Sequence, residues 1–444
     1  MSRQALKADV CAAIERNAGR IIASAEDLLR HPELGFREDR TANVVAHALS
    51  ELGLSVQTGL AVTGVKADLA CGGSGPSVAI LGEMDALPVP GHPLADGQTG
   101  AAHACGHFAQ VGMLLGAATA LRQTDLSELA GRIVFMAVPA EENVDLEFRQ
   151  TLRAAGRIEF TGGKQELIRL GAFDDVDMAM LTHASGGDMS HRIAYGGTTN
   201  GHLTKRAAFV GRAAHAGAAP HLGVNALKAA TLALVAIDAH REMFRDEDNI
   251  RVHPIITRGG DVVNAVPAEV RLETHVRANN LVALRGAAAR VDLALRGAAL
   301  AIGARVQIQT EPGYLPLHSA DGIDRLFHAN AVELLGTTNV LHDEHRAATT
   351  DMGDLSHLMP VIQPRCGGGS GRTHSSDFQL HDYRAGLVDP TKLMCMTIID
   401  LLIDEAAGAR AVQAAYQPRL NKPEYLQLMR AFTSVEEFGT LHPA

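Results

Sequence analysis

Short apolar runs alternate with helical patterns along the first part of this chain. The runs at 78–81, 133–138 and 176–181 consist largely of Val, Ile, Leu, Met and Ala, as do the buried strands of parallel sheets. Between the first two runs, residues 108–121 repeat apolar positions at helical spacing, with one apolar face. The alternation predicts an α/β fold with a doubly wound, mostly parallel sheet.

The pattern changes after Gly197 and predicts a second, smaller domain. Strands are expected near 202–210, 251–258, 268–277 and 304–310, with helices over 223–240 and 281–302. Two helices interleaved with four strands in this order predict a ferredoxin-like α+β domain. After Pro312 the chain is expected to return to the first domain. The predicted domains are residues 1–197 with 313–444, and an inserted domain over 198–312.

The composition narrows the class of protein. Of 444 residues, 46% are hydrophobic and 20% are charged, which is typical of a globular protein. The net charge of −10, without a Lys/Arg cluster, argues against a nucleic-acid surface and favours a small-molecule substrate. No run approaches the roughly 18 apolar residues of a membrane span, and the first ten residues do not resemble a signal peptide. We therefore expect a cytoplasmic protein without membrane contact.

Each apolar run leads into side chains that bind metals. These are Glu83 and Asp85 after the first run, Glu141 and Glu142 after the second, and His183 after the third. Because the carboxyl ends of parallel strands meet at one edge of a sheet, we expect these side chains to converge.

A fourth motif, His-Ala-Cys-Gly-His at 103–107, directly precedes the predicted helix at 108–121. At a helix N-terminus the dipole and the free amides favour a thiolate at Cys105. Cysteine, histidine and carboxylate are the donors that hold zinc or manganese, so the sequence predicts a metallohydrolase. The alternative interpretation of Cys105 is an ordinary buried thiol.

Glu141 and Glu142 suggest a division of labour. Adjacent side chains at a strand end point in different directions, so one carboxylate can bind metal while the other takes a proton from the attacking water. Asp85 is expected to orient a ligand histidine, not to bind metal itself. The alternative for the Glu pair is a solvated acidic turn, and for His183 and His374 it is a histidine without chemical function.

Five motifs follow one another along the chain. They are Glu-Met-Asp-Ala-Leu-Pro at 83–88, His-Ala-Cys-Gly-His at 103–107, Pro-Ala-Glu-Glu at 139–142, Ala-Ala-His-Ala-Gly-Ala-Ala-Pro-His at 213–221 and Asn-Ala-Val-Pro-Ala at 264–268. Together they resemble the aminoacylase and carboxypeptidase-like metallopeptidase family, which includes hippurate, auxin-conjugate and aminobenzoyl-glutamate hydrolases. The resemblance runs from about His31 to Asp404.

The resemblance implies a role for several residues. Glu141 would be the general base, and Asp85 would orient a ligand. Residues 198–312 would form a lid and dimerisation domain of a homodimer, from which His215 stabilises the oxyanion in the partner subunit's site while Asn264 contacts substrate. The resemblance also implies one or two divalent metals per subunit, either Mn²⁺ or Zn²⁺. Their implied ligands are Cys105, His107, Glu142, His183 and His374.

The chain departs from many of these relatives directly after His107. Where they carry Asp or Asn, and His two residues further on, this chain has Phe108 and Gln110. An apolar wall formed by Phe108 beside the metal would suit a flat or aromatic substrate. We therefore expect hydrolysis of a carbon–nitrogen bond in a small, anionic, aromatic substrate, with N-acyl or aminobenzoyl amino acids first. The alternatives are hydrolytic deamination of an aromatic amine such as 5-nitroanthranilate, a dipeptidase activity, and a non-catalytic binding protein on the same fold.

Overall fold

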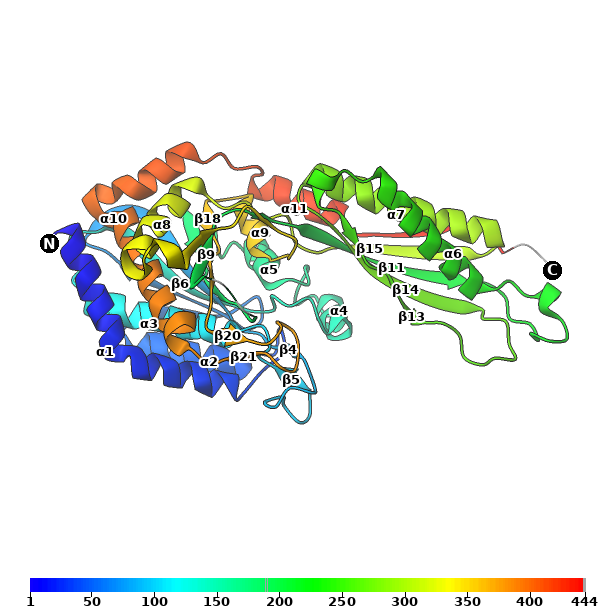
Figure 1. Ribbon diagram of the computed structural model, residues 1–444, viewed down its shortest axis with the longest axis horizontal. Helices are drawn as coiled ribbons and strands as arrows, with labels where there is room; N and C mark the ends of the chain where they lie inside the picture. Colours follow the sequence, from blue (N-terminus) through cyan, green and yellow to red (C-terminus); the bar gives the residue numbers. More distant parts are fainter. Residues whose placement is uncertain (188, 190, 442–444) are drawn as a thin grey trace. The chain divides into compact units, whose positions relative to one another are not determined.

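The computed structural model describes residues 1–187, 189 and 191–441, which form two compact units. The first unit comprises Met1–Gly197, His318–Glu344 and Asp354–Leu420. The second comprises Thr198–Leu317, His345–Gly353 and Asn421–Ala444 (Figure 1). Each unit has its own main sheet, and each is described by itself below.

The main sheet of the first unit has six strands in the order β1-β2-β6-β3-β7-β18. Their bounds are Ser55–Leu60 (β1), Gly64–Ala70 (β2), Gly73–Glu83 (β3), Ala130–Val138 (β6), Met178–Met180 (β7) and Val361–Ile362 (β18). β3, β6, β7 and β18 run parallel, whereas β1 and β2 form an antiparallel hairpin beside β6. This arrangement confirms the predicted mostly parallel α/β sheet, and β3 is buried continuously from Pro76 to Glu83.

Helices of the first unit pack on this sheet and on one another. They are α1 (Arg3–Leu29), α2 (Asp39–Glu51), α3 (His107–Gln123), α4 (Leu146–Ala154), α5 (Gly163–Leu170), α8 (Asp321–Leu335) and α10 (Asp389–Ala415). The prediction of a single apolar face for α3 is wrong, because every residue from His107 to Leu121 is buried. A Cβ added to Gly116 would lie 2.8 Å from Ile21, so α1 packs directly against the backbone of α3.

A smaller sheet in the first unit has the order β16-β9-β19-β8. Its strands are Val340–His342 (β16), Ile193–Tyr195 (β9), Arg365–Cys366 (β19) and His183–Ala184 (β8). Two short pairs complete this unit: Leu87–Pro88 (β4) with Ala101–Ala102 (β5), and Gly369–Ser370 (β20) with Gln379–Leu380 (β21). The loop between β20 and β21 carries His374.

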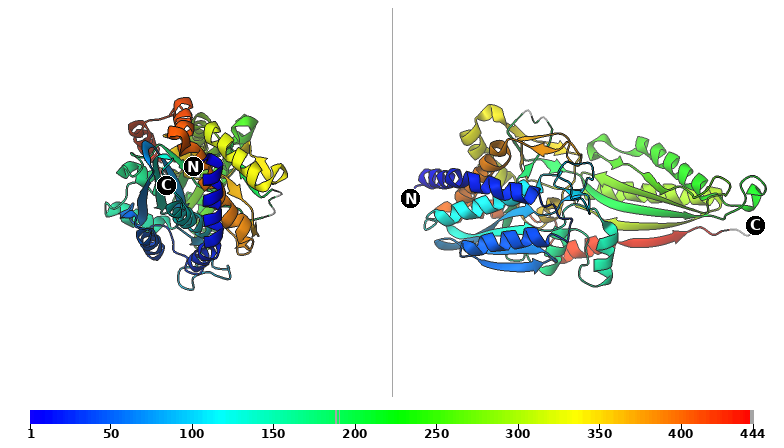
Figure 2. Two further views of the ribbon diagram at one scale, coloured as in Figure 1. Left: turned by 90° about the vertical axis from the view of Figure 1, so that its left-hand side faces the viewer. Right: turned by 90° about the horizontal axis from the view of Figure 1, so that it is seen from below.

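The second unit is built on a sheet in the order β12-β14-β11-β15-β22, with β13 also paired to β14. The strands are Gly201–Val210 (β11), Arg251–Val252 (β12), Ile255–Arg258 (β13), Glu269–Ala278 (β14), Arg305–Pro312 (β15) and Ser434–Phe438 (β22). Helices α6 (Ala226–Ala239) and α7 (Leu281–Ile302) lie side by side on one face of this sheet (Figure 1, Figure 2). The helices expected over 223–240 and 281–302 thus lie close to their expected positions.

The second unit also takes in a segment that was expected in the first domain. Residues Asn421–Ala444 group with it, because β22 pairs antiparallel with β15 and helix α11 (Lys422–Ala431) precedes that strand. A single short strand carries little sequence signal of which sheet it will join.

Among the described residues, none of the helices combines the length and the apolar character needed to cross a bilayer.

Candidate metal centre

The parallel strands of the first unit end at one edge and deliver their polar residues there. Glu83 pairs in register with Val138, so β3 and β6 end at the same level, whereas β7 ends at Met180, opposite Ile80 of β3. Asp85 and the Glu141–Glu142 pair follow within a few residues of the first two ends. His183 forms the start of β8, next to Arg365 of β19.

Cys105 and His107 reach the same place from the start of α3. Gly106, the N-cap of this helix, adopts φ = 97°, a conformation that glycine adopts without strain. A Cβ there would lie 3.2 Å from the carbonyl oxygen of Ala184 and 3.3 Å from the Phe378 ring. Glycine therefore allows the close packing that brings Cys105 beside β8.

Three groups of donor atoms converge in this region. Within each group, one ligand atom per residue lies within 4.8 Å of the others: Cys105–His107–His183, Cys105–Glu142–His374 and Glu83–His107–Glu141. The first two groups share Cys105, whose Sγ lies 3.4 Å from Nε2 of His183 and 3.4 Å from Nε2 of His374. All the predicted ligands therefore come together, although they are spread over 270 positions from 105 to 374.

The histidine rings present the correct nitrogen for a metal. Nδ1 of His107 lies 2.8 Å from the carbonyl oxygen of Asp85, and Nδ1 of His183 lies 2.7 Å from that of Ala184. These contacts assign a proton to Nδ1, so Nε2 is the nitrogen that faces the donor cluster. In His107, Nε2 is buried and makes no hydrogen bond with the described residues.

The spacing and chemistry of this set fit a divalent metal. Zinc bonds to sulfur and nitrogen of ordinary length place two tetrahedral ligand atoms about 3.6 Å apart, close to the observed separations. Nε2 of His374 lies 3.0 Å from Oε1 of Glu142, which adds a carboxylate to the second group. Thiolate, imidazole and carboxylate together suit zinc or manganese.

Asp85 connects two of these ligands. One carboxylate oxygen accepts a hydrogen bond of 2.8 Å from the backbone N–H of Glu142, and the other lies 3.3 Å from Nδ1 of His107. Asp85 is fully buried and belongs to none of the three donor groups. Asp85 thus contacts Glu142 and His107, and its predicted role in orienting a ligand stays a prediction.

Burial and charge act in opposite directions on the ionisable ligands. Burial and the charge of Glu142 raise the pKa of the Cys105 thiol well above its ordinary value. For the protein alone this direction is opposite to the thiolate expected at the start of α3, whereas a coordinated metal removes the proton outright. Burial tends to raise the pKa of Glu142, yet His374 brings it below its usual range.

Two residues that the sequence did not predict hold the Glu141–Glu142 turn. Ala140 has φ = 52°, and its N–H donates a 2.8 Å hydrogen bond to Oε1 of Glu38. Arg149, only 1% exposed, donates to the carbonyl oxygen of Glu142. Glu38 lies outside any periodic apolar pattern, and a charged residue such as Arg149 normally indicates a surface helix, so neither residue carried a sequence signal.

Three other predicted residues lie outside the three groups of donor atoms. Phe108 is fully buried, belongs to the hydrophobic core and packs against His103 at 5.8 Å between ring centres. A wall formed by Phe108 beside the metal stays a prediction. His215 and Asn264 are exposed in the second unit, where the N–H of Ala216 donates to the carbonyl oxygen of Asn264.

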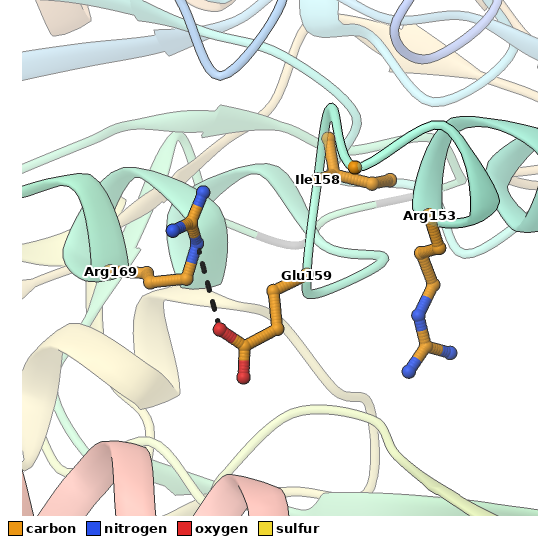
Figure 3. Close-up of a pocket in the computed structure, with 5 residues that line it drawn as sticks. Arg153, Ile158, Glu159 and Arg169 are labelled. Atoms are coloured by element: carbon orange, nitrogen blue, oxygen red, sulfur yellow. Dashed lines mark ion pairs between the residues drawn. The ribbon is translucent and has the colours of Figure 1, made fainter.

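A pocket of about 330 Å³ lies elsewhere in the first unit, between α4 and α5 (Figure 3). It is lined by Arg153, Gly156, Ile158, Glu159 and Arg169. An ion pair of 3.9 Å joins Arg169 to Glu159 across it. None of the predicted site residues lines this pocket.

Comparison with known proteins agrees with this geometry. The model of peptidase family M20/M25/M40 matches residues 79–388. One of the p-aminobenzoyl-glutamate hydrolase subunits of Escherichia coli is 31% identical over 334 residues, which cover 63% of this chain and 71% of that protein. Xaa-Arg dipeptidase of Mus musculus is 31% identical over 299 residues. These residues cover 65% of this chain but only 60% of the dipeptidase.

Solved structures share the fold. The YXEP protein of Bacillus subtilis, described as a dinuclear metal-binding peptidase of the M20 family, superposes with a TM-score of 0.68 at 21% identity. The match covers 88% of this chain and 99% of that one.

The buried Glu38 predicts a pH dependence of stability. Burial and the charge of Asp85 raise the pKa of Glu38 from an ordinary 4.5 to about 8. The folded state thus favours the neutral form of Glu38. The stability that this protonated carboxyl contributes is fully present below about pH 4.5 and is lost as the pH rises through about 8. Between about pH 5 and 8.5 we expect the free energy of unfolding to fall in both wild type and Glu38→Gln. The fall in the variant is expected to be smaller than in wild type by a few kcal/mol.

Urea unfolding of chelator-treated wild type and Glu38→Gln at a series of pH values measures this difference. Identical slopes of stability against pH for the two proteins would show that Glu38 ionises normally.

Proposed function

Because the chain belongs to peptidase family M20/M25/M40, we propose that it is a metal-dependent hydrolase of carbon–nitrogen bonds in small anionic substrates. Its preferred substrates in this proposal are N-acyl or aminobenzoyl amino acids. The observation that carries it is the pair of three-donor groups that share Cys105, with Glu141 beside them. The name of the Escherichia coli relative supports the aminobenzoyl class.

The ligands in this proposal are Cys105, His107, Glu142, His183 and His374. Two donor groups with a common thiol favour two divalent ions per subunit, Mn²⁺ or Zn²⁺. A divalent metal bound there polarises the scissile carbonyl and makes a water molecule a stronger nucleophile near neutral pH. Asp85, which contacts Glu142 and His107, keeps the ligands oriented.

Glu141 is the general base of the proposed reaction. Glu141 is 8% exposed, and its carboxylate lies 3.9 Å from Nε2 of His107, at the edge of the donor cluster. From there it takes the proton of the attacking water and passes it to the departing nitrogen. Glu142 cannot share this task, because its carboxylate contacts His374.

The second unit, in this proposal, is a lid that also forms a homodimer. Nδ1 of His215 accepts hydrogen bonds from the N–H groups of Gly217 and Ala218, at 3.2 and 3.0 Å. The proton therefore resides on Nε2, an exposed donor that suits an oxyanion in the partner subunit's site. Asn264 lies on the neighbouring segment and contacts substrate.

Exposed apolar residues of the second unit support the dimer. Leu232 and Val235 on α6 are 38% and 60% exposed, and Ile255 on β13 is 54% exposed. Among the described strands, β13 pairs only with β14, so it also presents an open edge. A second copy of the chain would cover both features.

Replacing the proposed base separates metal binding from turnover. Glu141→Gln is expected to keep its metal content but to lose about 100-fold or more in kcat, because the amide cannot accept the proton of water. Mass spectrometry of products from N-acyl amino acids, aminobenzoyl-glutamate, Xaa-Arg and β-alanyl dipeptides and 5-nitroanthranilate measures the turnover, with and without chelator.

Chelator-sensitive release of a free amino acid supports the amidohydrolase, and cleavage of dipeptides alone would make the protein a dipeptidase. Ammonia with a hydroxylated ring would establish the aromatic deaminase instead. Tight binding of these compounds without any product would favour a binding protein. Near-normal turnover by Glu141→Gln would exclude Glu141 as the base.

Cys105→Ser tests the shared ligand. We expect its affinity for Zn²⁺ to fall about tenfold or more, because a hydroxyl is a much poorer donor than a thiolate. Competition with a chromogenic chelator measures the affinity. Cys395→Ser is the control, since Cys395 is also buried and belongs to none of the donor groups. Equal affinities of both variants and wild type would make Cys105 an ordinary buried thiol.

Mixing two inactive variants tests whether His215 acts across a dimer. Subunits carrying Glu141→Gln and subunits carrying His215→Ala, unfolded and refolded together, are expected to regain about a quarter of wild-type activity, because half the dimers then hold one complete site. Light scattering during gel filtration gives the oligomeric state. A monomeric protein, or mixed dimers that regain no activity, would contradict the proposal that His215 acts in the partner subunit's site.

A further inference from the structure

A buried cluster of three polar side chains lies behind His107. Lys164 from α5, Glu83 from the end of β3 and Gln110 from α3 are each no more than 1% exposed. No apolar pattern explains a lysine, a glutamate and a glutamine in the interior, and burying the lysine and the glutamate carries a large desolvation cost. Their presence together calls for an electrostatic explanation.

Glu83 is held from both sides. Nζ of Lys164 lies 2.6 Å from Oε1 of Glu83, and Nε2 of Gln110 donates a 2.8 Å hydrogen bond to Oε2. The side-chain oxygen of Gln110 also accepts a 3.1 Å hydrogen bond from the backbone N–H of Glu83. Both carboxylate oxygens are therefore occupied, and the carboxylate cannot rotate without breaking one of these bonds.

The held carboxylate reaches the metal centre. Oε2 of Glu83 lies 3.2 Å from Nε2 of His107, the nitrogen that faces the donor cluster. Glu83, His107 and Glu141 form the third group of donor atoms within 4.8 Å. Without Lys164 and Gln110, Glu83 would be a further anionic donor next to the two groups that share Cys105.

We propose that Lys164 and Gln110 are positioning residues that keep Glu83 from binding the metal and neutralise its charge. This inference rests on the proposed function, in which His107 and its neighbours hold a divalent metal. The cluster thereby lowers the negative charge at the site, so that the metal is bound less tightly and remains a stronger Lewis acid toward substrate.

The chain offers a second buried cluster of the same kind as a control. Nζ of Lys7 lies 2.7 Å from Oδ2 of Asp400, and Nδ2 of Asn330 donates a 2.8 Å hydrogen bond to the same oxygen. This lysine–carboxylate–amide set lies in the same unit but includes none of the proposed ligands. Effects common to both clusters are due to stability, and effects confined to Lys164 are due to the metal centre.

Metal affinity of four proteins tests the proposal: wild type, Lys164→Met, Glu83→Gln and the double variant. Lys164→Met is expected to bind Mn²⁺ and Zn²⁺ about tenfold more tightly, because it removes the positive charge beside Glu83. Glu83→Gln is expected to bind them about tenfold more weakly, because it removes the negative charge beside His107 and keeps the positive charge of Lys164. The double variant, neutral at both positions, is expected to resemble wild type. Chelator competition gives the affinity, and inductively coupled plasma mass spectrometry gives the metal content.

A purely structural role predicts a different pattern. Both single variants would then bind metal more weakly, and this result, or unchanged affinity in Lys164→Met, would overturn the proposal. Lys7→Met is expected to lower the melting temperature without changing metal affinity. Should either single variant fail to fold, Gln110→Met gives an independent test: it frees Oε2 of Glu83, so tighter binding is expected and unchanged binding overturns the proposal.

Failure of the two proposals can be told apart. If wild type binds neither Mn²⁺ nor Zn²⁺, the proposed function fails and this inference fails with it. If wild type binds metal and turns over substrate but the single variants do not shift in opposite directions, only the role of Lys164 and Gln110 is wrong.

Discussion

The parallel register of β3, β6 and β7 is the constraint on which the metal centre depends. It brings the ends of β3 and β6 to one level and the end of β7 to a position opposite Ile80, so that a few residues beyond each end are enough to place acidic and histidine side chains together. Short turns after the strands then set the positions of the side chains, including a turn at Ala140 with φ = 52°. The carboxylate of Asp85 contacts both the turn after β6, at Glu142, and the helix that starts at His107.

Such convergence gathers carboxylates in a region with little water, and the structure offsets each charge differently. Glu83 is paired with Lys164, and Glu142 is paired with His374. Glu38 accepts hydrogen bonds from Thr63 and from the backbone of Ala140, yet its pKa is still raised. The centre is therefore a balanced set of charges in which no carboxylate can be changed without affecting its neighbours.

The part of this arrangement that follows from local pattern could be predicted. Apolar runs located the strands, and the polar residues at their ends located the donor cluster around Cys105. The counter-charges could not be predicted, because Lys164 and Arg149 look like surface residues in sequence and become internal only through tertiary packing. For the same reason Phe108, next to the proposed ligand His107 in sequence, proved to be a core residue.

The pairing of β22 with β15 has a consequence for how the protein is made. On the ribosome, β11, β14 and β15 emerge more than a hundred residues before Ser434–Phe438, so the nascent second unit exposes the edge of β15 while the rest of the chain is synthesised. His374 also emerges late, well after Cys105. Metal loading and the pairing of that sheet edge therefore both come late in synthesis, and until then the edge of β15 is open to association with other strands.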